Sequence, residues 1–387
     1  MKIAIPKEIM PEEKRVAATP ETVEKLISMG FRAAVETGAG KGIFSDDEKY
    51  RSVGAEIVQD VRSLYEQADV VLKVKEPMFN ETVGKHEIDM MKDESILITF
   101  LHPAAPSNHE IVRMLREKRI TSFTMDGIPR TSRAQRMDAL TSMSTVTGYK
   151  SVLIAANHLL TFIPMIGTAI GSIKPAKFLV IGAGVVGLQS IATIKRLGGI
   201  ITAVDIRPEA REEALSLGAK LGGFEVPSEL ATGKGGYAKA LPSEWLEKER
   251  TALTPLLEDA DATIVSALVP GEVAPIVITE EMVEAMKAGS VIVDVSIDQG
   301  GNCAITEAGK EVYRNGVLIS GLKNIPGRMP VHSTWLYANN MLHYVENLFK
   351  NGAGKPDLED EIVTSSLVTH AGKIVHEGTL KALGETN

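Results

Sequence analysis

Short apolar runs alternate with amphipathic, helix-like stretches along most of this chain. In the second half the apolar runs are nearly continuous, at 177–181, 200–204, 263–267 and 291–295. Strands of a parallel sheet are covered on both faces, so their sequences are apolar throughout instead of alternating. Each run leads into a loop that contains glycine, proline or polar residues. The pattern predicts a doubly wound α/β sheet in this part of the chain.

The first third of the chain carries a similar but more interrupted pattern. Apolar runs at 2–5, 32–36, 70–74, 95–100 and 120–124 predict strands. Helical stretches separate these runs, and one of them begins with the threonine–proline pair that is typical of a helix start. We therefore expect a second α/β domain that is built on the same plan.

These patterns indicate two domains, of which the first is discontinuous in sequence. At 387 residues the chain is long enough for each domain to bury its own core. A helical pattern over 335–349 follows the second domain and most simply crosses back to the first. We assign residues 1–138 plus 335–387 to one domain and residues 139–334 to a Rossmann domain. The expected fold class is α/β, with two Rossmann-like doubly wound parallel-sheet domains and a cleft between them.

One uncharged stretch, residues 151–173, is long enough to cross a bilayer. It also contains Asn157, His158 and Pro164, and two glycines lie near its end. We interpret it as a buried helix over 147–162 that is followed by a loop. The protein is expected to be soluble without detergent, and a membrane span is the less favoured alternative.

Composition narrows the class of protein further. The formal net charge is −8, and no basic patch interleaved with aromatic residues is present, which argues against a nucleic-acid surface. Cys303 is the only cysteine, so neither an internal disulfide nor a cysteine-based metal cluster is expected. Residues 1–15 carry charges and prolines where a secretory signal would be apolar. A cytoplasmic protein is the default expectation.

The most informative local pattern is a Gly-x-Gly-x-x-Gly motif at Gly182, Gly184 and Gly187. The first glycine permits a tight turn, the second lets the backbone approach a pyrophosphate, and the third lets the helix pack closely on the sheet. The helix that follows presents unpaired N–H groups to the phosphates. The motif predicts a dinucleotide site, and the alternative is a structural turn without a ligand.

An acidic residue, Asp205, closes the next apolar run. A carboxylate at this position accepts hydrogen bonds from the adenosine ribose and repels a 2′-phosphate, which favours NAD over NADP. Arg207 complicates this choice because a nearby arginine can accept a 2′-phosphate. Loops at 268–271 and 296–302 follow later strands, so we expect them at the rim of the same site. The irregular stretch over 225–250 is expected to be a surface excursion at its edge.

A second and rarer motif lies at 129–138, where arginines, a glutamine and an aspartate follow a proline. It resembles the nicotinamide loop of proton-translocating NAD(P) transhydrogenase, in the NAD(H)-binding domain of the alpha subunit. The resemblance extends over essentially the whole chain, and this loop is its most specific part. The other matching segments are 3–8, 15–17, 182–187, 205–207, 235–238, 268–271, 300–303 and 358–361.

The resemblance implies a soluble homodimer that acts as an oxidoreductase and as a component of a proton translocase. It would bind NAD(H), dock on a membrane-spanning transhydrogenase subunit, and pass hydride to NADP(H) held by a partner domain. Such a chain is cytoplasmic and peripheral to the inner membrane through its partners, without direct membrane insertion. In the family the arginine, glutamine and aspartate of the loop orient the nicotinamide, and they correspond to Arg130, Gln135 and Asp138.

Further residues match positions at which the family contacts NAD. With the glycine motif, the expected cofactor-binding residues are Arg130, Thr131, Ser132, Arg133, Gln135, Thr141, Gly182, Gly184, Val185, Gly187, Asp205, Ile206, Arg207, Gly236 and Leu268. Thr141 stands where the family has serine, a departure that keeps the hydroxyl group. Glu249 stands where the family usually has glutamine. Since a carboxylate near a pyrophosphate is unfavourable, this contact is not carried over.

The chemistry of the loop agrees with this role. Direct hydride transfer between two nicotinamides needs no proton donor or acceptor, and the protein has to hold two rings close together and correctly oriented. The amide of Gln135 is suited to fixing a carboxamide, and Asp138 and the arginines can hold that amide in place. From composition alone the same residues are also compatible with a solvated loop that binds no ligand.

Alanine dehydrogenase, a sister family with the same architecture, is the competing interpretation. Its substrate positions correspond to Arg15, Lys75, His102 and Asp298, and all four residue types are present here. An arginine and a lysine are suited to a carboxylate and a carbonyl, and His102 to general acid–base chemistry. Against this interpretation, alanine dehydrogenases lack the arginine-rich loop and the C-terminal extension. A non-catalytic NAD-binding module is the third alternative.

Overall fold

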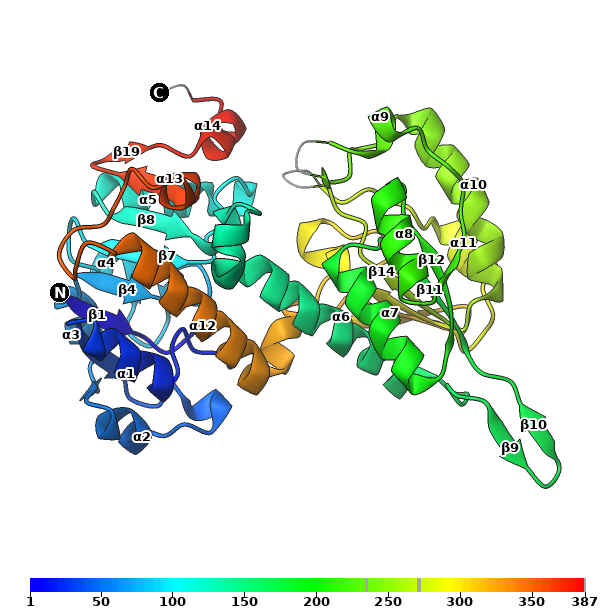
Figure 1. The fold of residues 1–387 in the computed structure, drawn as a ribbon, viewed down its shortest axis with the longest axis horizontal. Coiled ribbons are helices and arrows are strands. Elements are labelled where there is room, and N and C mark those ends of the chain that lie inside the picture. The colour runs from blue at the N-terminus through cyan, green and yellow to red at the C-terminus, as the bar shows by residue number, and fades with distance from the viewer. Residues whose placement is uncertain (234–235, 270–272, 386–387) are drawn as a thin grey trace. The chain divides into compact units, whose positions relative to one another are not determined.

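The computed structural model describes residues 1–233, 236–269 and 273–385 (Figure 1). The chain divides into two compact units, each with its own sheet and its own apolar core. Unit 1 comprises Met1–Met143 with Gly327–Asn387, and unit 2 comprises Ser144–Pro326. Both sheets are dominated by parallel strand pairs, which confirms the α/β class.

Unit 1 contains an eight-stranded sheet with the order β19-β18-β8-β7-β4-β1-β2-β3. Its strands are β1 (Lys2–Ile5), β2 (Arg32–Glu36), β3 (Glu56–Val58), β4 (Val70–Leu72), β7 (Ile96–Thr99), β8 (Thr121–Thr124), β18 (Leu367–His370) and β19 (Lys373–Ile374). The strands from β8 to β3 are parallel, and the β18–β19 hairpin is antiparallel at one edge. The strands predicted in the first third of the chain are confirmed, with two of them shortened to β4 and β7.

Both faces of this sheet are covered, because successive residues of one strand enter two different cores. Ile3 and Ile5 of β1 join a core with helices on one face, whereas Ala4 joins the core on the other face. The helices of the first face are α1 (Pro20–Ser28), α2 (Asp47–Ser52), α12 (Pro330–Leu348) and α13 (Glu361–Ser366). The helices of the second face are α3 (Val61–Glu66), α4 (Glu87–Met90), α5 (His109–Glu117) and α14 (Glu377–Leu383). This full coverage explains the apolar strands.

Helix α12 is the helix predicted over 335–349, and it packs on the sheet of unit 1. Its buried residues Tyr337, Met341, Val345 and Leu348 recur at the spacing of one helix face. The hydroxyl of Tyr337 also donates to the Lys73 carbonyl oxygen at 2.7 Å. The tail that follows, predicted as an edge strand or arm, forms α13 before the β18–β19 edge hairpin.

Unit 2 contains a seven-stranded sheet with the order β13-β12-β11-β14-β15-β17-β16. Its strands are β11 (Lys177–Ile181), β12 (Ile200–Val204), β13 (Lys220–Leu221), β14 (Ala262–Val265), β15 (Val291–Asp294), β16 (Glu311–Arg314) and β17 (Val317–Ser320). Its helices are α7 (Val185–Leu197), α8 (Pro208–Ser216), α9 (Ser228–Ala231), α10 (Ser243–Asp259) and α11 (Glu280–Glu284). The chain order reverses at β11, which pairs with β12 on one side and β14 on the other. In such sheets this reversal marks the ligand site.

Helix α6 (Ala139–His158) differs at both ends from the helix predicted over 147–162. The stretch after it, predicted as a loop, contains the hairpin of β9 (Ile166–Thr168) and β10 (Gly171–Ile173), which projects from the sheet of unit 2 (Figure 1). Its apolar side chains are not buried, since Ile170 is 100% exposed. Apolar character is therefore a misleading guide to burial here. Among the described residues, no helix is long and apolar enough to span a membrane.

The boundaries between the units lie beside two long helices. The first falls within α6, after Met143, and the second falls after Pro326, ahead of α12. The boundaries predicted after residues 138 and 334 lie a few residues from these positions. A continuous helix carries no change of composition at such a point, so the sequence offers no signal that would locate the boundary to a single residue.

Candidate functional site

The glycine motif forms the turn between β11 and α7. Gly182 has a φ of +89°, and a Cβ there would lie 2.8 Å from the Ser266 carbonyl oxygen. A Cβ on Gly187 would lie 1.9 Å from the Gly182 carbonyl oxygen. Around Gly184, the N-cap of α7, the nearest atom to such a Cβ is an Arg207 nitrogen 3.9 Å away. The turn is therefore closed at two glycines and open at the third, where a phosphate would approach.

Asp205, at the end of β12, holds this turn in place. Its Oδ2 accepts a hydrogen bond from the Ala183 N–H at 2.7 Å. Arg207 donates to both carboxylate oxygens, from Nε to Oδ1 at 3.0 Å and from Nη2 to Oδ2 at 2.8 Å. Arg207 also donates to the Gly236 carbonyl oxygen at 3.2 Å, while Gly235 lies outside the described residues. Because its guanidinium is paired with a carboxylate, Arg207 is a poorer partner for a 2′-phosphate than the sequence alone allowed.

Two further residues that match family contact positions lie next to the turn. Val185 is the first residue of α7 and directly follows Gly184. Ile206 is half-buried and stands between Asp205 and Arg207. Their placement is compatible with the contacts that the family resemblance implies.

Glu249 is a second carboxyl group at this end of unit 2. It lies on α10 and is only 6% exposed. Burial, reinforced by the negative charge of Asp205, raises the pKa of Glu249 to about 7. The two acids are therefore close enough for their charges to interact. Near neutral pH a large share of Glu249 is protonated, and in that form it resembles the glutamine that the family usually has.

The rim of the site is supported by Asn302, which the sequence analysis did not single out. Asn302 is fully buried and joins the loops that follow β14 and β15. Its side chain accepts from the Ala267 N–H at 2.9 Å and donates to the Ala267 carbonyl oxygen at 2.8 Å. Leu268, the next residue, is half-buried at this edge, while Pro270 and Gly271 lie outside the described residues. The matching segment 300–303 was the available signal for Asn302.

The arginine-rich loop lies in unit 1 and contains the 3₁₀ helix η4 (Ser132–Met137). Ala134 and Met137 are buried and anchor the loop to the core of the unit. The residues expected to face a cofactor are all exposed: Arg130, Thr131, Ser132, Arg133 and Gln135. Exposed polar side chains on a buried anchor are the arrangement that a ligand-binding loop requires.

Asp138 and Thr141 act together at the end of this loop. The Asp138 carboxylate accepts from the Thr141 backbone N–H at 2.8 Å and from its hydroxyl at 2.6 Å. Asp138 thereby satisfies the first turn of α6, as an N-cap does. The pair fixes where the loop ends and the helix begins, and the hydroxyl kept by threonine is needed for it.

Arg133 is held by the C-terminal segment of unit 1. Its guanidinium pairs with Asp360, with Nη1 2.7 Å from Oδ2. Nη2 lies 3.3 Å from Glu361. The sequence placed Asp360 in a matching segment but assigned it no role. The structure thus joins the arginine-rich loop to the C-terminal extension.

The residues of the competing interpretation lie at several places. Arg15 is buried in unit 1, and its Nε and Nη2 donate to the Glu13 carboxylate at 2.8 and 2.6 Å. This pairing already neutralises the charge that a substrate carboxylate would need. Lys75 is half-buried just after β4, and Asp298 is exposed in unit 2.

His102 is the member of this set with the most suggestive surroundings. It follows β7, is exposed, and has a φ of +44°, a left-handed conformation that is uncommon for histidine. Its Nδ1 lies 3.2 Å from Oδ2 of Asp126, and that negative charge raises the pKa of His102. A histidine oriented by a carboxylate is also the usual arrangement of a general base.

Comparison with known proteins places this architecture. The model of the family described as alanine dehydrogenase/PNT, N-terminal domain, matches residues 4–147. The corresponding C-terminal domain model matches residues 151–377. The chain belongs to the alanine dehydrogenase/PNT family. Membership implies NAD(H) binding, which agrees with the glycine turn and Asp205.

Relatives within the alanine dehydrogenase/PNT family differ in their similarity to this chain. An NAD(P) transhydrogenase alpha-subunit protein of Rhodospirillum rubrum is 43% identical over 383 residues, covering 97% of this chain and 98% of the relative. The crystal structure of transhydrogenase from Sinorhizobium meliloti gives a TM-score of 0.84 at 36% identity, with 97% and 100% of the chains covered. Alanine dehydrogenase of Methanococcus maripaludis is 31% identical, with coverages of 99% and 96%.

These relatives bear on two predictions. All three are named as oxidoreductases, and the prediction that the chain belongs to a transhydrogenase-type oxidoreductase is confirmed. The relatives called subunit alpha imply that other subunits exist. Alanine dehydrogenase is confirmed as a sister branch of the family, at lower identity.

Proposed function

We propose that this chain is the NAD(H)-binding subunit of a proton-translocating NAD(P) transhydrogenase. NADP(H) would be held by a partner domain, and a membrane-spanning partner subunit would couple hydride transfer to proton movement. The observation that carries the proposal is the exposed loop at 130–138, anchored by Ala134 and Met137. A 43% identical relative of nearly the same extent supports it.

Each half of the cofactor would meet residues suited to it. At the adenosine end, the open turn at Gly184 would receive the phosphates and Asp205 would accept hydrogen bonds from the ribose hydroxyls. At the other end, Arg130 and Gln135 would hold the carboxamide and orient the ring. NADH supplies the hydride itself, so these side chains bind and orient and carry no proton.

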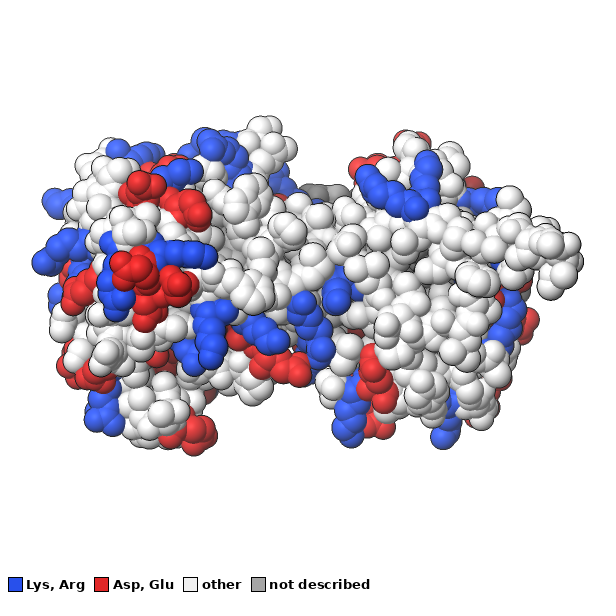
Figure 2. Space-filling view, turned by 90° about the horizontal axis from the view of Figure 1, so that it is seen from below, with Lys and Arg blue, Asp and Glu red and all other residues white. Residues whose placement is uncertain are grey.

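The subunit would be a homodimer on the cytoplasmic side of the membrane, peripheral to it through its partners. Exposed apolar side chains around the β9–β10 hairpin support association with a second copy. Leu160 is 85% exposed, Met165 69% and Ile170 100%. On the face seen in Figure 2, the projecting end of unit 2 carries no charged side chain. An uncharged apolar projection of this kind gains free energy when a second surface covers it.

The second candidate function is an alanine dehydrogenase. The His102–Asp126 pair favours it, because it supplies an acid–base group at the carboxyl edge of the sheet of unit 1. The Arg15–Glu13 pair argues against it, since the arginine that would bind a substrate carboxylate already has a carboxylate partner. We therefore rank it second.

One experiment separates the two candidates. The purified chain is mixed with an NADP-loaded transhydrogenase partner domain, and hydride transfer from NADH is followed in a single turnover. The proposal expects transfer only when the partner domain is present, and no alanine-dependent NAD reduction by the chain alone. Alanine-dependent reduction by the chain alone would establish the second candidate instead. NAD(H) binding with neither reaction would leave a binding module.

A further inference from the structure

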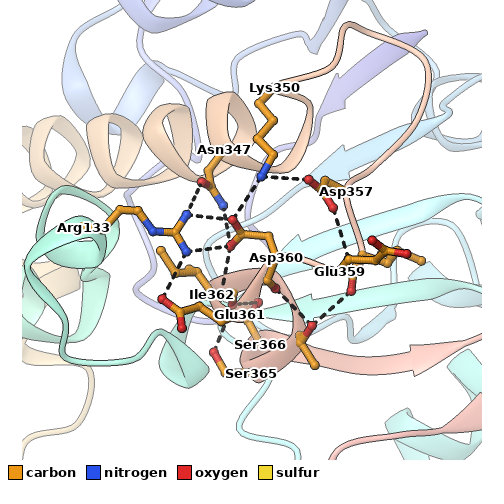
Figure 3. A network of polar contacts seen from close by, with 12 residues as sticks. Arg133, Asn347, Lys350, Asp357, Glu359, Asp360, Glu361, Ile362, Ser365 and Ser366 are labelled. Carbon is orange, nitrogen blue, oxygen red and sulfur yellow. Dashed lines mark hydrogen bonds and ion pairs between the residues drawn. The ribbon is translucent and has the colours of Figure 1, made fainter.

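A network of polar contacts in unit 1 ties the loop at 130–138 to the C-terminal segment (Figure 3). The guanidinium of Arg133 meets both oxygens of Asp360, with Nη1–Oδ2 at 2.7 Å and Nη2–Oδ1 at 3.2 Å. Two parallel N–H···O bonds form the strongest and most directional pairing of an arginine with a carboxylate. This contact therefore constrains the direction of the Arg133 side chain as well as its distance.

Asp360 is in turn held by three further donors. Lys350 Nζ lies 3.2 Å from Oδ2, and Asn347 Nδ2 and the Ile362 N–H donate to Oδ1 at 3.2 and 3.0 Å. The Asp360 side chain is only 4% exposed. The hydrogen bonds from Arg133 hold the pKa of Asp360 well below its usual range, so the carboxylate is ionised at neutral pH. Asp360 is thus a fixed negative charge built into the rigid part of the unit.

Helix α12 carries the other supports of the same loop. Asn340 Nδ2 donates to the Arg136 carbonyl oxygen at 2.8 Å. Asn347 accepts from Arg133 Nη1 at 3.2 Å. Asn340 and Asn347 are two helical turns apart and therefore lie on one face of α12. The loop consequently rests on α12 at Arg136 and on Asp360 at Arg133.

We propose that Asp360 is a positioning residue for hydride transfer, acting through Arg133 on the loop that presents Arg130 and Gln135. This inference rests on the proposed function, because it concerns the hydride step. The cofactor-facing side chains of the loop are exposed and have few packing contacts of their own. Misplacement of a reacting ring by about 1 Å can cost on the order of 10²-fold in rate. A loop released from Asp360 would therefore slow the reaction while leaving the fold intact.

A purely structural role makes a different prediction. Arg133 is 47% exposed, so its ion pair with Asp360 lies partly in water. Pairs of this kind contribute about 0–1 kcal/mol to global stability. Their loss hardly changes the unfolding transition of the unit. The hydride rate and the unfolding midpoint thus separate the two roles.

The variant Asp360→Asn tests the charge with little change of shape. Asparagine is as good an N-cap as aspartate, so the start of α13 is preserved. The matched control is Asp357→Asn, which removes the partner 2.8 Å from Lys350 Nζ without touching Arg133. Arg133→Gln is the companion variant, and it takes second place because Arg133 also stands at a family cofactor-contact position.

Single-turnover hydride transfer to the NADP-loaded partner domain is the first readout. Asp360→Asn should slow it at least about tenfold and leave the NADH dissociation constant within about threefold, because adenosine-end contacts dominate binding. Asp357→Asn should match the wild type. The double variant with Arg133→Gln should be no slower than the slower single variant, since both changes break one contact. A wild-type rate in Asp360→Asn, losses that multiply, or a defect wholly in NADH binding would each overturn the proposal.

Limited trypsin digestion of the isolated chain is the second readout, and it does not depend on activity. Cleavage after Arg130 and Arg136 reports how often the loop opens. Asp360→Asn should be cut several-fold faster there than the wild type, with a thermal midpoint lower by no more than about 4–8 °C, the equivalent of 1 kcal/mol. If the wild type transfers no hydride, the proposed function fails, and digestion alone decides whether Asp360 holds the loop. Equal cleavage would reject that claim.

Discussion

Replacing Glu249 by glutamine tests the electrostatics of unit 2 most directly. The fold raises the pKa of this carboxyl from 4.5 to about 7, mainly by burial and then through the negative charge of Asp205. The difference of about 2.5 units (7 − 4.5), at 1.36 kcal/mol per unit, corresponds to about 3 kcal/mol against the ionised form in the folded state. Glutamine has the same shape and does not ionise. Glu249→Gln should therefore remove this cost.

The sign of the effect follows from where the proton is held. Below pH 4.5 the carboxyl of Glu249 is protonated in the folded and the unfolded chain, so it contributes no pH dependence. Between pH 4.5 and about 7 the unfolded chain has lost the proton that the folded chain keeps, and the wild type loses stability as pH rises. Above about pH 7 the full cost remains constant. The variant should thus exceed the wild type by about 3 kcal/mol at pH 8 and match it near pH 4.

Tryptophan fluorescence provides the assay. The chain has two tryptophans, Trp245 on the same helix as Glu249 and Trp335 in unit 1, so Trp335→Phe leaves a reporter of unit 2 alone. Trp245 stacks on Phe224 with ring centroids 6.1 Å apart, a contact that unfolding removes. Urea unfolding is measured from pH 5 to pH 8 in this background.

The control variant is Glu247→Gln, on the same helix but with a side chain that is 69% exposed. It should change the unfolding free energy by about 1 kcal/mol or less at every pH. A stabilisation by Glu249→Gln that does not grow between pH 5 and pH 8 would refute the reasoning. So would a stabilisation of less than about 1 kcal/mol at pH 8.

Three further predictions concern the cofactor and the assembly. Asp205→Asn frees Arg207 for a 2′-phosphate and should lower the preference for NADH over NADPH at least about tenfold by calorimetry; an unchanged ratio contradicts this. Gln135→Asn shortens the amide by one methylene and should slow single-turnover hydride transfer on the order of 10²-fold with nearly unchanged NADH affinity. A defect confined to binding would remove Gln135 from this role. Ile170→Asp should shift the sedimenting species from dimer to monomer, and an unaltered species would exclude the hairpin from the interface.

The features predicted correctly from the sequence are those whose constraints are local. Gly182 and Gly187 are required by atoms of the same strand–turn–helix unit, so their spacing alone indicates the turn. Asp205 follows the next strand and pairs with Arg207 two residues later. Parallel strands buried on both faces likewise leave a mark in every residue of the run.

Long-range contacts and exposed apolar residues left no such mark. Arg133 and Asp360 are brought together by α12 and the β18–β19 hairpin, and neither residue type predicts the pairing. The hairpin around Ile170 is apolar because of what it lacks in charge, and sequence pattern alone does not distinguish a buried run from an exposed one. Glu13 stands two residues from Arg15, yet only the backbone path shows that the two side chains meet.

The interrupted sequence of unit 1 sets the order in which the protein acquires its structure during synthesis. Residues 1–143 leave the ribosome first, but the α12 side chains that complete their core, such as Tyr337 and Val345, come after all of unit 2. At 5–20 residues per second, the interval between β1 and α12 is on the order of 20–60 s.

During that interval unit 2, which is contiguous, can fold as a whole, while the face of β1 that carries Ile3 and Ile5 still lacks its covering helix. Apolar faces exposed in this way are the surfaces to which chaperones bind. The first strand to be synthesised is therefore among the last segments of the protein to reach its final surroundings.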